Sequence, residues 1–323
     1  MDRRRFVKSA GALAALSSMN LTDLYAADSA ALKMINIVRT QSGFEREKLI
    51  RPFGFKGGYL TELWQVASRM QSDSGISRIG LATQSVLYGD SDLFPRQSET
   101  EGNAMMYNLV NKALEHVKKT PFRTPPELLD KILPAVIQDG KIITAKQDLN
   151  INFVYNALVG VDNAAWLTYA AENKFSSFED MIPEQYKKAL SHRNKKIAIM
   201  YQIPYGMPME DLKNAAKQGY FVFKIKSGAP GTQSEMIEAD IIRLSLIHET
   251  LKDLRTNQTE NGKLIYTIDA NARYEKKETL LKYLDHARKI GAFDQILLIE
   301  EPLNENNEES VADIDLRIGA DES

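Results

Sequence analysis

The segment Phe221-Val222-Phe223-Lys224-Ile225-Lys226-Ser227-Gly228 alternates strictly between two kinds of side chain, and the fold can be worked out from it. Successive side chains of a β-strand point to opposite faces, so the two lysines share one face and the aromatic residues and isoleucine share the other. Two lysines at the C-terminal end of one face must be solvated or paired with acids, because burying an unpaired charge is costly. An exposed edge strand with a lysine-covered face is the alternative explanation.

Strands and helices alternate from residue 196 onward. We expect strands over 196–203, 221–226, 264–269, 296–300 and 316–321, and helices over 209–218, 234–254 and 278–290. This alternation requires parallel strands joined by right-handed crossovers, which an open doubly wound sheet and a (β/α)₈ barrel both satisfy. Charged residues end four successive strands, and in a barrel such ends converge on one mouth. The predicted fold class is therefore α/β, a TIM-like (β/α) barrel that is incomplete here at about five strands.

Acidic residues end the three strands that follow the lysine strand. Asp269 ends the first, with Asn271 two residues later, and the next two strands end in Glu300-Glu301 and Asp321. Period-2 alternation places Asp269 and Glu300 on the inner face and turns Glu301 away. Three carboxylates that meet repel one another unless a cation lies between them, and carboxylate oxygens suit octahedral Mg²⁺. Surface acids at the starts of loops remain the simpler explanation for any one of these residues.

In this order the motifs resemble those of the enolase superfamily. The matching pieces are Lys224-Ile225-Lys226, Asp269-Ala270-Asn271, Ile299-Glu300-Glu301-Pro302 and Ala320-Asp321-Glu322-Ser323, within a resemblance that covers roughly residues 34 to 323. Residues 157–166 are similar to the segment that precedes the barrel of that superfamily. The Lys-x-Lys group and an Asp as third acid resemble the muconate-cycloisomerase-like subgroup of mandelate racemase/muconate lactonizing enzymes. Arg273 departs from the pattern, because relatives often have a glycine there.

The resemblance implies Mg²⁺-dependent abstraction of the α-proton of a small-molecule carboxylate substrate through an enediolate, in a racemase or epimerase of dipeptides or N-acylamino acids. Asp269, Glu300 and Asp321 would be the metal ligands, and Asn271 would contact the substrate. Lys226 would be the catalytic base in its neutral form, which the neighbouring cations, Lys224 and the metal, favour. A cycloisomerase or acid-sugar dehydratase of the same superfamily, or a non-catalytic exported binding protein, are the alternatives.

A smaller domain is expected to precede the barrel. We predict an α+β capping domain over residues 34–150 and the partial barrel domain over 151–323. The elements expected in this part of the chain are strands over 33–40 and 79–88, a glycine-rich loop over 53–59, and helices from 102 to before 121, over 125–136 and over 152–171. The alternation of strand and loop followed by helices is typical of such a domain.

The first 27 residues are expected to be a twin-arginine-type signal peptide. Arg3-Arg4 with Phe6 and Lys8 precedes a short apolar run that is too brief to span a membrane, and cleavage is expected near Ala26-Ala27. We therefore expect export to the periplasm and no membrane span. A basic amphipathic helix is the alternative.

Composition excludes several classes of function. The sequence has 323 residues, 43% hydrophobic and 26% charged, with a net charge of −2, so nothing indicates a nucleic-acid partner. The absence of cysteine excludes disulfides, thiolate metal sites and cysteine nucleophiles. The sequence leaves open whether the protein forms a homo-oligomer. The superfamily's opposing lysine, on the sixth strand, has no counterpart, so we expect a fragment of a longer protein, with a degraded relative as the alternative.

Overall fold

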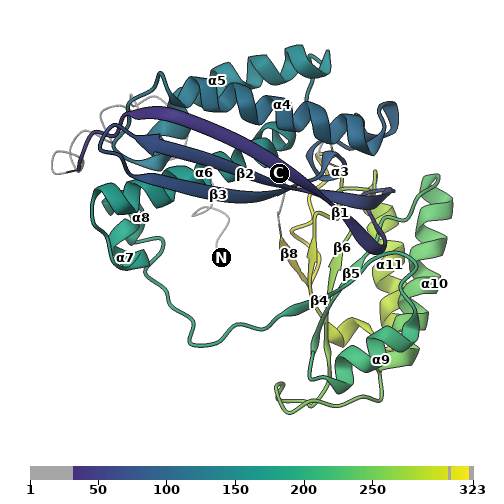
Figure 1. Ribbon diagram of the computed structural model, residues 1–323. Helices are drawn as coiled ribbons and strands as arrows, with labels where there is room; N and C mark the ends of the chain where they lie inside the picture. Colours follow the sequence, from purple (N-terminus) through teal and green to yellow (C-terminus); the bar gives the residue numbers. More distant parts are fainter. Residues whose placement is uncertain (1–31, 305–306, 320–323) are drawn as a thin grey trace. The chain divides into compact units, whose positions relative to one another are not determined.

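The computed structural model describes residues 32–304 and 307–319, which form two compact units (Figure 1). The first unit takes in residues up to 45 together with 64–84 and 103–193, and the second takes in 46–63, 85–102 and 194–323. Both units therefore draw on several stretches of the chain. The signal peptide expected over 1–27 lies outside the described residues.

A three-stranded antiparallel sheet has the order β1-β2-β3, and the first unit contains β3 together with residues 37–45 of β1 and 64–72 of β2. Its strands are β1 (Ile37–Phe55), β2 (Gly58–Ser72) and β3 (Ser77–Gln84). The helices α4 (Glu99–Val117), α5 (Pro125–Thr144) and α6 (Ile151–Glu172) lie on one side of this sheet (Figure 1), and the short helices α7 (Phe178–Met181) and α8 (Glu184–Lys187) follow. Helix α6 belongs to this unit, and the predicted domain boundary at residue 150 stays a prediction.

Strand β3 and helix α6 approach each other closely at Gly80. A Cβ atom placed on Gly80 would lie 2.2 Å from the carbonyl oxygen of Gly160, so only glycine fits there. The amide groups of Asn156 and Asn163 donate hydrogen bonds to carbonyl oxygens of β3, at 3.1 and 2.9 Å. Helix α6 thus supplies hydrogen-bond donors to two backbone carbonyl groups of β3, which is an edge strand of the sheet.

The prediction for residues 53–59 was wrong in extent, because β1 and β2 form one long hairpin whose turn is confined to Lys56 and Gly57. Strand β2 was not predicted at all. Alternate side chains of β2 are buried, but Glu62, Ser68 and Ser72 stand among them, so the apolar period that marks a half-buried strand is interrupted. The tip of this hairpin, residues 46–63, belongs to the second unit.

The second unit contains a five-stranded parallel sheet with the order β4-β5-β6-β7-β8, which confirms the predicted fold class. Its strands are β4 (Met200–Ile203), β5 (Val222–Lys226), β6 (Ile265–Asp269), β7 (Ile296–Glu300) and β8 (Arg317–Gly319). The helices α9 (Met209–Lys217), α10 (Gln233–Leu251) and α11 (Lys277–Ile290) lie along one side of it (Figure 1). Shorter pieces are α3 (Val86–Gly89), η2 (Phe94–Arg96) and η3 (Phe293–Gln295).

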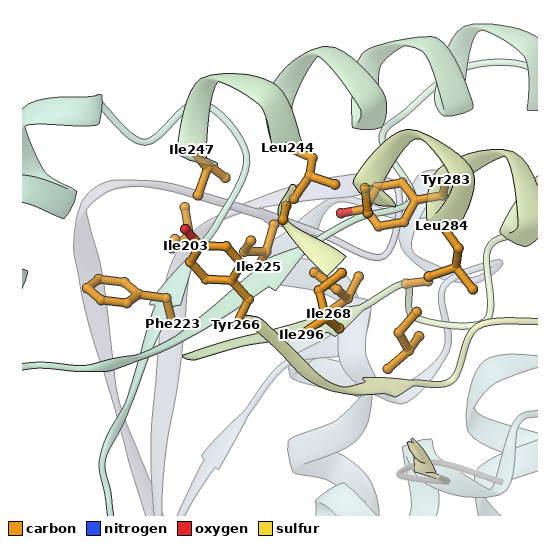
Figure 2. Close-up of a cluster of buried hydrophobic side chains, with 14 of the residues drawn as sticks. Ile203, Phe223, Ile225, Leu244, Ile247, Tyr266, Ile268, Tyr283, Leu284 and Ile296 are labelled. Atoms are coloured by element: carbon orange, nitrogen blue, oxygen red, sulfur yellow. The ribbon is translucent and has the colours of Figure 1, made fainter. Parts of the chain in front are cut away.

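The core between this sheet and its helices fixes which face of each strand carries chemistry. Phe223 and Ile225 of β5 are fully buried beside Leu244 and Ile247 of α10 (Figure 2). Burying a side chain of this size contributes about 1.5–3 kcal/mol. Because side chains alternate along a strand, this packing turns the two lysines of β5 to the opposite face. None of the helices that the structure describes is long and apolar enough to cross a membrane.

Candidate active site

The strand register brings the predicted site residues to one edge of the parallel sheet. Lys226 at the end of β5 pairs with Asp269 at the end of β6, and Asp269 pairs with Glu300 at the end of β7. Parallel strands end at the same edge, which in barrel enzymes is the edge that carries the active site. Three neighbouring strands thus present a lysine and two carboxylate side chains next to one another.

The side chains at this edge form a compact ion-pair network. Nζ of Lys226 lies 2.5 Å from Oδ2 of Asp269, and Nζ of Lys224 lies 2.9 Å from the same oxygen. Lys224 also donates a hydrogen bond to Glu300. The side chains of both lysines are 9% exposed, that of Asp269 is 1% exposed and that of Glu300 is 15% exposed. Charges so far from solvent are stable only when they are paired in this way.

The network favours the charged forms of two of its members, Asp269 and Lys224. Burial of Asp269 favours its neutral acid, but attraction and hydrogen bonding from Lys226 and then Lys224 outweigh burial and lower the pKa of this carboxyl. Burial likewise disfavours the ammonium of Lys224, yet its hydrogen bond to Glu300 and its attraction to Asp269 raise its pKa.

Asn271 links Asp269 to the hairpin tip. Its backbone N–H and side-chain Nδ2 donate to Oδ1 of Asp269 at 3.1 and 2.5 Å, and its Oδ1 accepts a hydrogen bond from the backbone N–H of Lys56 at 3.3 Å. The backbone of Asn271 has a positive φ of 50°, which asparagine tolerates better than most residues. The side chain therefore orients an acid of the site, while its predicted contact with substrate stays a prediction.

The hairpin tip supplies site residues that sequence reasoning missed. The ring of Phe55 lies 5.4 Å from Nζ of Lys226, a cation–π distance. Gly57, at φ 75°, packs so closely on the guanidinium of Arg273 that a Cβ atom there would lie 2.5 Å from it. Arg273 was the residue in the sequence that could have drawn attention to this contact, because it departs from the glycine expected at that position. Its side chain packs against Gly57 in the turn of the hairpin.

Two of the three predicted metal ligands, Asp269 and Glu300, lie within the described residues. Asp269 and Glu300 lie on adjacent strands and offer the hard oxygen donors that Mg²⁺ prefers, so they fit such an ion. Lys224 hydrogen-bonds to both, so a cation would compete with its ammonium for the same oxygens. The third predicted ligand, Asp321, lies outside the described residues. Within those residues, no group of three His, Cys, Asp or Glu side chains could hold a metal ion.

A cavity of about 480 Å³ lies at the other edge of the same sheet. It is lined by residues that precede or begin β6 and β7, among them Leu264, Ile265 and Ile296. These are N-terminal strand ends, and in barrel enzymes the active site lies at the C-terminal ends. The cavity therefore does not compete with the lysine and acid cluster as the candidate site.

No protein-family model and no curated protein matches the sequence. Solved structures do match. The L-Ala-D/L-Glu epimerase from Bacillus subtilis, solved as a substrate-liganded complex, is 19% identical with a TM-score of 0.54, and the match covers 89% of this chain and 68% of that chain. The dipeptide epimerase from Enterococcus faecalis V583, complexed with Mg and the dipeptide L-Leu-L-Tyr, is 15% identical with a TM-score of 0.57 over the same shares, 89% and 68%.

A mandelate racemase/muconate lactonizing protein from Herpetosiphon aurantiacus is 15% identical with a TM-score of 0.58, again over 89% of this chain and 68% of that chain. At such low identity the likeness is one of fold. The chain therefore shares the fold of the dipeptide epimerases and of the mandelate racemase/muconate lactonizing proteins, as its resemblance to the enolase superfamily predicted.

Proposed function

We propose that this protein abstracts the α-proton of a small-molecule carboxylate with the help of Mg²⁺, as a racemase or epimerase of dipeptides or N-acylamino acids. One observation carries the proposal. Two lysine ammonium groups meet two carboxylates at the C-terminal edge of three adjacent parallel strands, with 2.5 Å between Lys226 Nζ and Asp269 Oδ2. The structural neighbours with Mg or dipeptide complexes support the choice of ion and substrate class.

The α-proton of a carboxylate is only weakly acidic, because its removal places a second negative charge on an anion. Mg²⁺ held by Asp269, Glu300 and the predicted ligand Asp321 would neutralise that developing charge. The rest of the chemistry falls to the side chains. A base must stand within hydrogen-bond reach of the carbon that loses its proton, and it must accept the proton in its neutral form.

Lys226 is the side chain best placed for this role. It ends β5, next to Asp269, and its ammonium group faces the ring of Phe55. Phe55 covers one side of the lysine and so limits the water around its amino group, which still has to exchange its proton with solvent in each turnover. Lys224 lies one step further back on the same face and bridges Asp269 and Glu300, so its charge keeps the two acids together.

Proton exchange with solvent tests this function directly. The protein is incubated in D₂O with Mg²⁺ and with L-Ala-L-Glu, L-Leu-L-Tyr or an N-acetylated amino acid, and the α-proton signals are followed by NMR. We expect exchange at the residue with the free carboxylate, no exchange at the N-terminal residue of the dipeptides, and no exchange after chelation of the metal. Absence of exchange from every compound in the presence of Mg²⁺ would overturn the proposal.

A further inference from the structure

Two charged residues of helix α10 lie behind the turn that follows the lysine strand. Asp240 is 2% exposed, and its Oδ2 accepts hydrogen bonds from the N–H of Gly228 at 2.7 Å and from the hydroxyl of Tyr274 at 2.9 Å. Its Oδ1 accepts a bond from the N–H of Ala229 at 3.3 Å. The carboxylate thus gathers backbone donors just beyond Lys226.

Arg243, one turn along the same helix, gathers backbone acceptors. Its Nη1 donates to the carbonyl oxygen of Lys226 at 2.7 Å, and its Nη2 donates to the carbonyl oxygens of Ile203, at 2.7 Å, and Pro204. Proline has no N–H group, so β4 cannot extend its ladder with β5 through residue 204. The planar guanidinium fork instead joins the C-terminal ends of both strands, which a single ammonium cannot do with the same geometry.

A second side chain, Tyr205, also holds the turn that follows β5. The hydroxyl of Tyr205 lies 2.8 Å from the carbonyl oxygen of Ser227 and 2.7 Å from that of Gly228. Gly228 has a φ of 77°, and a Cβ atom there would lie 2.6 Å from the side chain of Arg273. The backbone next to Lys226 is therefore confined by several groups, and Arg243 is the side chain that hydrogen-bonds to the backbone carbonyl oxygen of Lys226.

We propose that Arg243 is a positioning residue that sets where Lys226 presents its side chain to the reacting carbon. This inference rests on the proposed function, in which Lys226 is the base. Arg243 touches neither Asp269 nor Glu300 through any bond that the described residues show, so its influence on the site passes through the backbone of β5. A misplacement of about 1 Å at a reacting group can cost about 100-fold in rate.

Arg243→Lys keeps the charge and removes the fork, and Arg288→Lys, on the outer side of α11, is the matched control. Arg288 is 45% exposed and pairs only with Asp285 among the ion pairs described. With the compound that the wild-type protein exchanges fastest, we expect Arg243→Lys to lower kcat for α-proton exchange by about 100-fold with KM within about twofold. Mg²⁺ should still raise the melting temperature of this variant, because Asp269 and Glu300 keep their places.

A second measurement does not depend on catalysis. Brief acetylation with acetic anhydride, read by peptide mass spectrometry, reports how well Lys226 is held against Asp269, with the surface residue Lys282 as internal standard. We expect labelling of Lys226 to rise several-fold in Arg243→Lys and to stay unchanged in Arg288→Lys. If Arg243→Lys does not fold, as judged by circular dichroism, Arg243→Gln is measured in its place by the same criteria.

The two proposals fail in different ways. A wild-type protein without α-proton exchange contradicts the proposed function, whatever the labelling shows. Unchanged Lys226 labelling in a folded Arg243 variant overturns the positioning role, and so does an unchanged kcat in a protein that does catalyse exchange. An equal fall in kcat for Arg243→Lys and Arg288→Lys also overturns it, because the loss would then reflect general damage.

Discussion

Lys226 and Asp269 meet across the paired ends of β5 and β6, where Nζ of the lysine lies 2.5 Å from Oδ2 of the acid. Both side chains are almost fully removed from solvent. In the proposed reaction Lys226 takes up the α-proton and Asp269 binds Mg²⁺. The base and a metal ligand are therefore in direct contact.

Magnesium should stabilise the folded protein through Asp269 and Glu300. A ligand that binds only the native state adds about 2.7 kcal/mol when its concentration is 100 times its Kd. We expect Glu300→Gln to abolish the rise in melting temperature on adding Mg²⁺, measured by calorimetry. Glu301→Gln is the control, because this neighbour is predicted to face away, and it should keep most of the rise. Equal losses in both variants would show that the face assignment is wrong.

The stability of the first unit should depend on the titration of Asp162. Burial raises the pKa of its carboxyl from 3.8 to about 6, against the opposing hydrogen bond with Trp166. The folded state therefore binds the proton more tightly than the unfolded state, and stability falls as pH rises through this range. Among the described groups, Oδ1 of Asp162 has no hydrogen-bond partner.

Asp162→Asn removes this titration. Relative to wild type, the variant should gain on the order of 2 kcal/mol in unfolding free energy between about pH 4.5 and about pH 7.5, measured by urea denaturation. Asp148→Asn is the control, since the side chain of Asp148 is 88% exposed. A difference from wild type that stays constant with pH would contradict burial of the charged acid.

The close approach of β3 and α6 predicts a steric effect at Gly80. Gly80→Ala would place Cβ 2.2 Å from the carbonyl oxygen of Gly160, and we expect a loss of about 2–3 kcal/mol in unfolding free energy. Gly43→Ala is the matched control because nothing lies within 4 Å of its added Cβ. If the two substitutions change the midpoint of urea unfolding alike, the packing of α6 on β3 is not as described.

The twin-arginine signal can be tested by transport alone. We predict that a reporter fused to residues 1–30 reaches the periplasm and that Arg3→Lys with Arg4→Lys stops it. Fractionation of cells with a folded fluorescent reporter measures the outcome, and a fusion to residues 32–60 is the control. Transport that persists after the double substitution would refute the signal.

The parallel half of the fold could be predicted from sequence because its rules are local. Each strand alternates on its own, and parallel strands must end at one edge, so Lys226, Asp269 and Glu300 could be brought together without knowledge of any distance. The bounds of β7, Ile296–Glu300, agree with the expected 296–300, whereas β4 begins at Met200 and not at the expected residue 196. Asp321 lies outside the described residues, and its role stays a prediction.

The remaining parts of the site depend on contacts between residues far apart in the chain. The hydrogen bond from Lys56 to Asn271 and the approach of Phe55 to Lys226 require the hairpin tip to lie against the strand ends, which no local pattern in residues 53–59 signals. Arg243 stands on a helix whose apolar stripe predicts core packing, so the pattern gave no reason to expect its bond to Lys226.

The central claim is that Lys226 takes the α-proton, and one substitution tests it most directly. In D₂O with Mg²⁺ and the dipeptide that the wild type exchanges fastest, we predict that Lys226→Ala lowers the rate of α-deuterium incorporation from one epimer by about 10² to 10⁴-fold, as loss of a positioned base does. Lys282→Ala on the surface of α11 is the control and should leave the rate unchanged. Exchange at the wild-type rate with both epimers in Lys226→Ala would contradict the account.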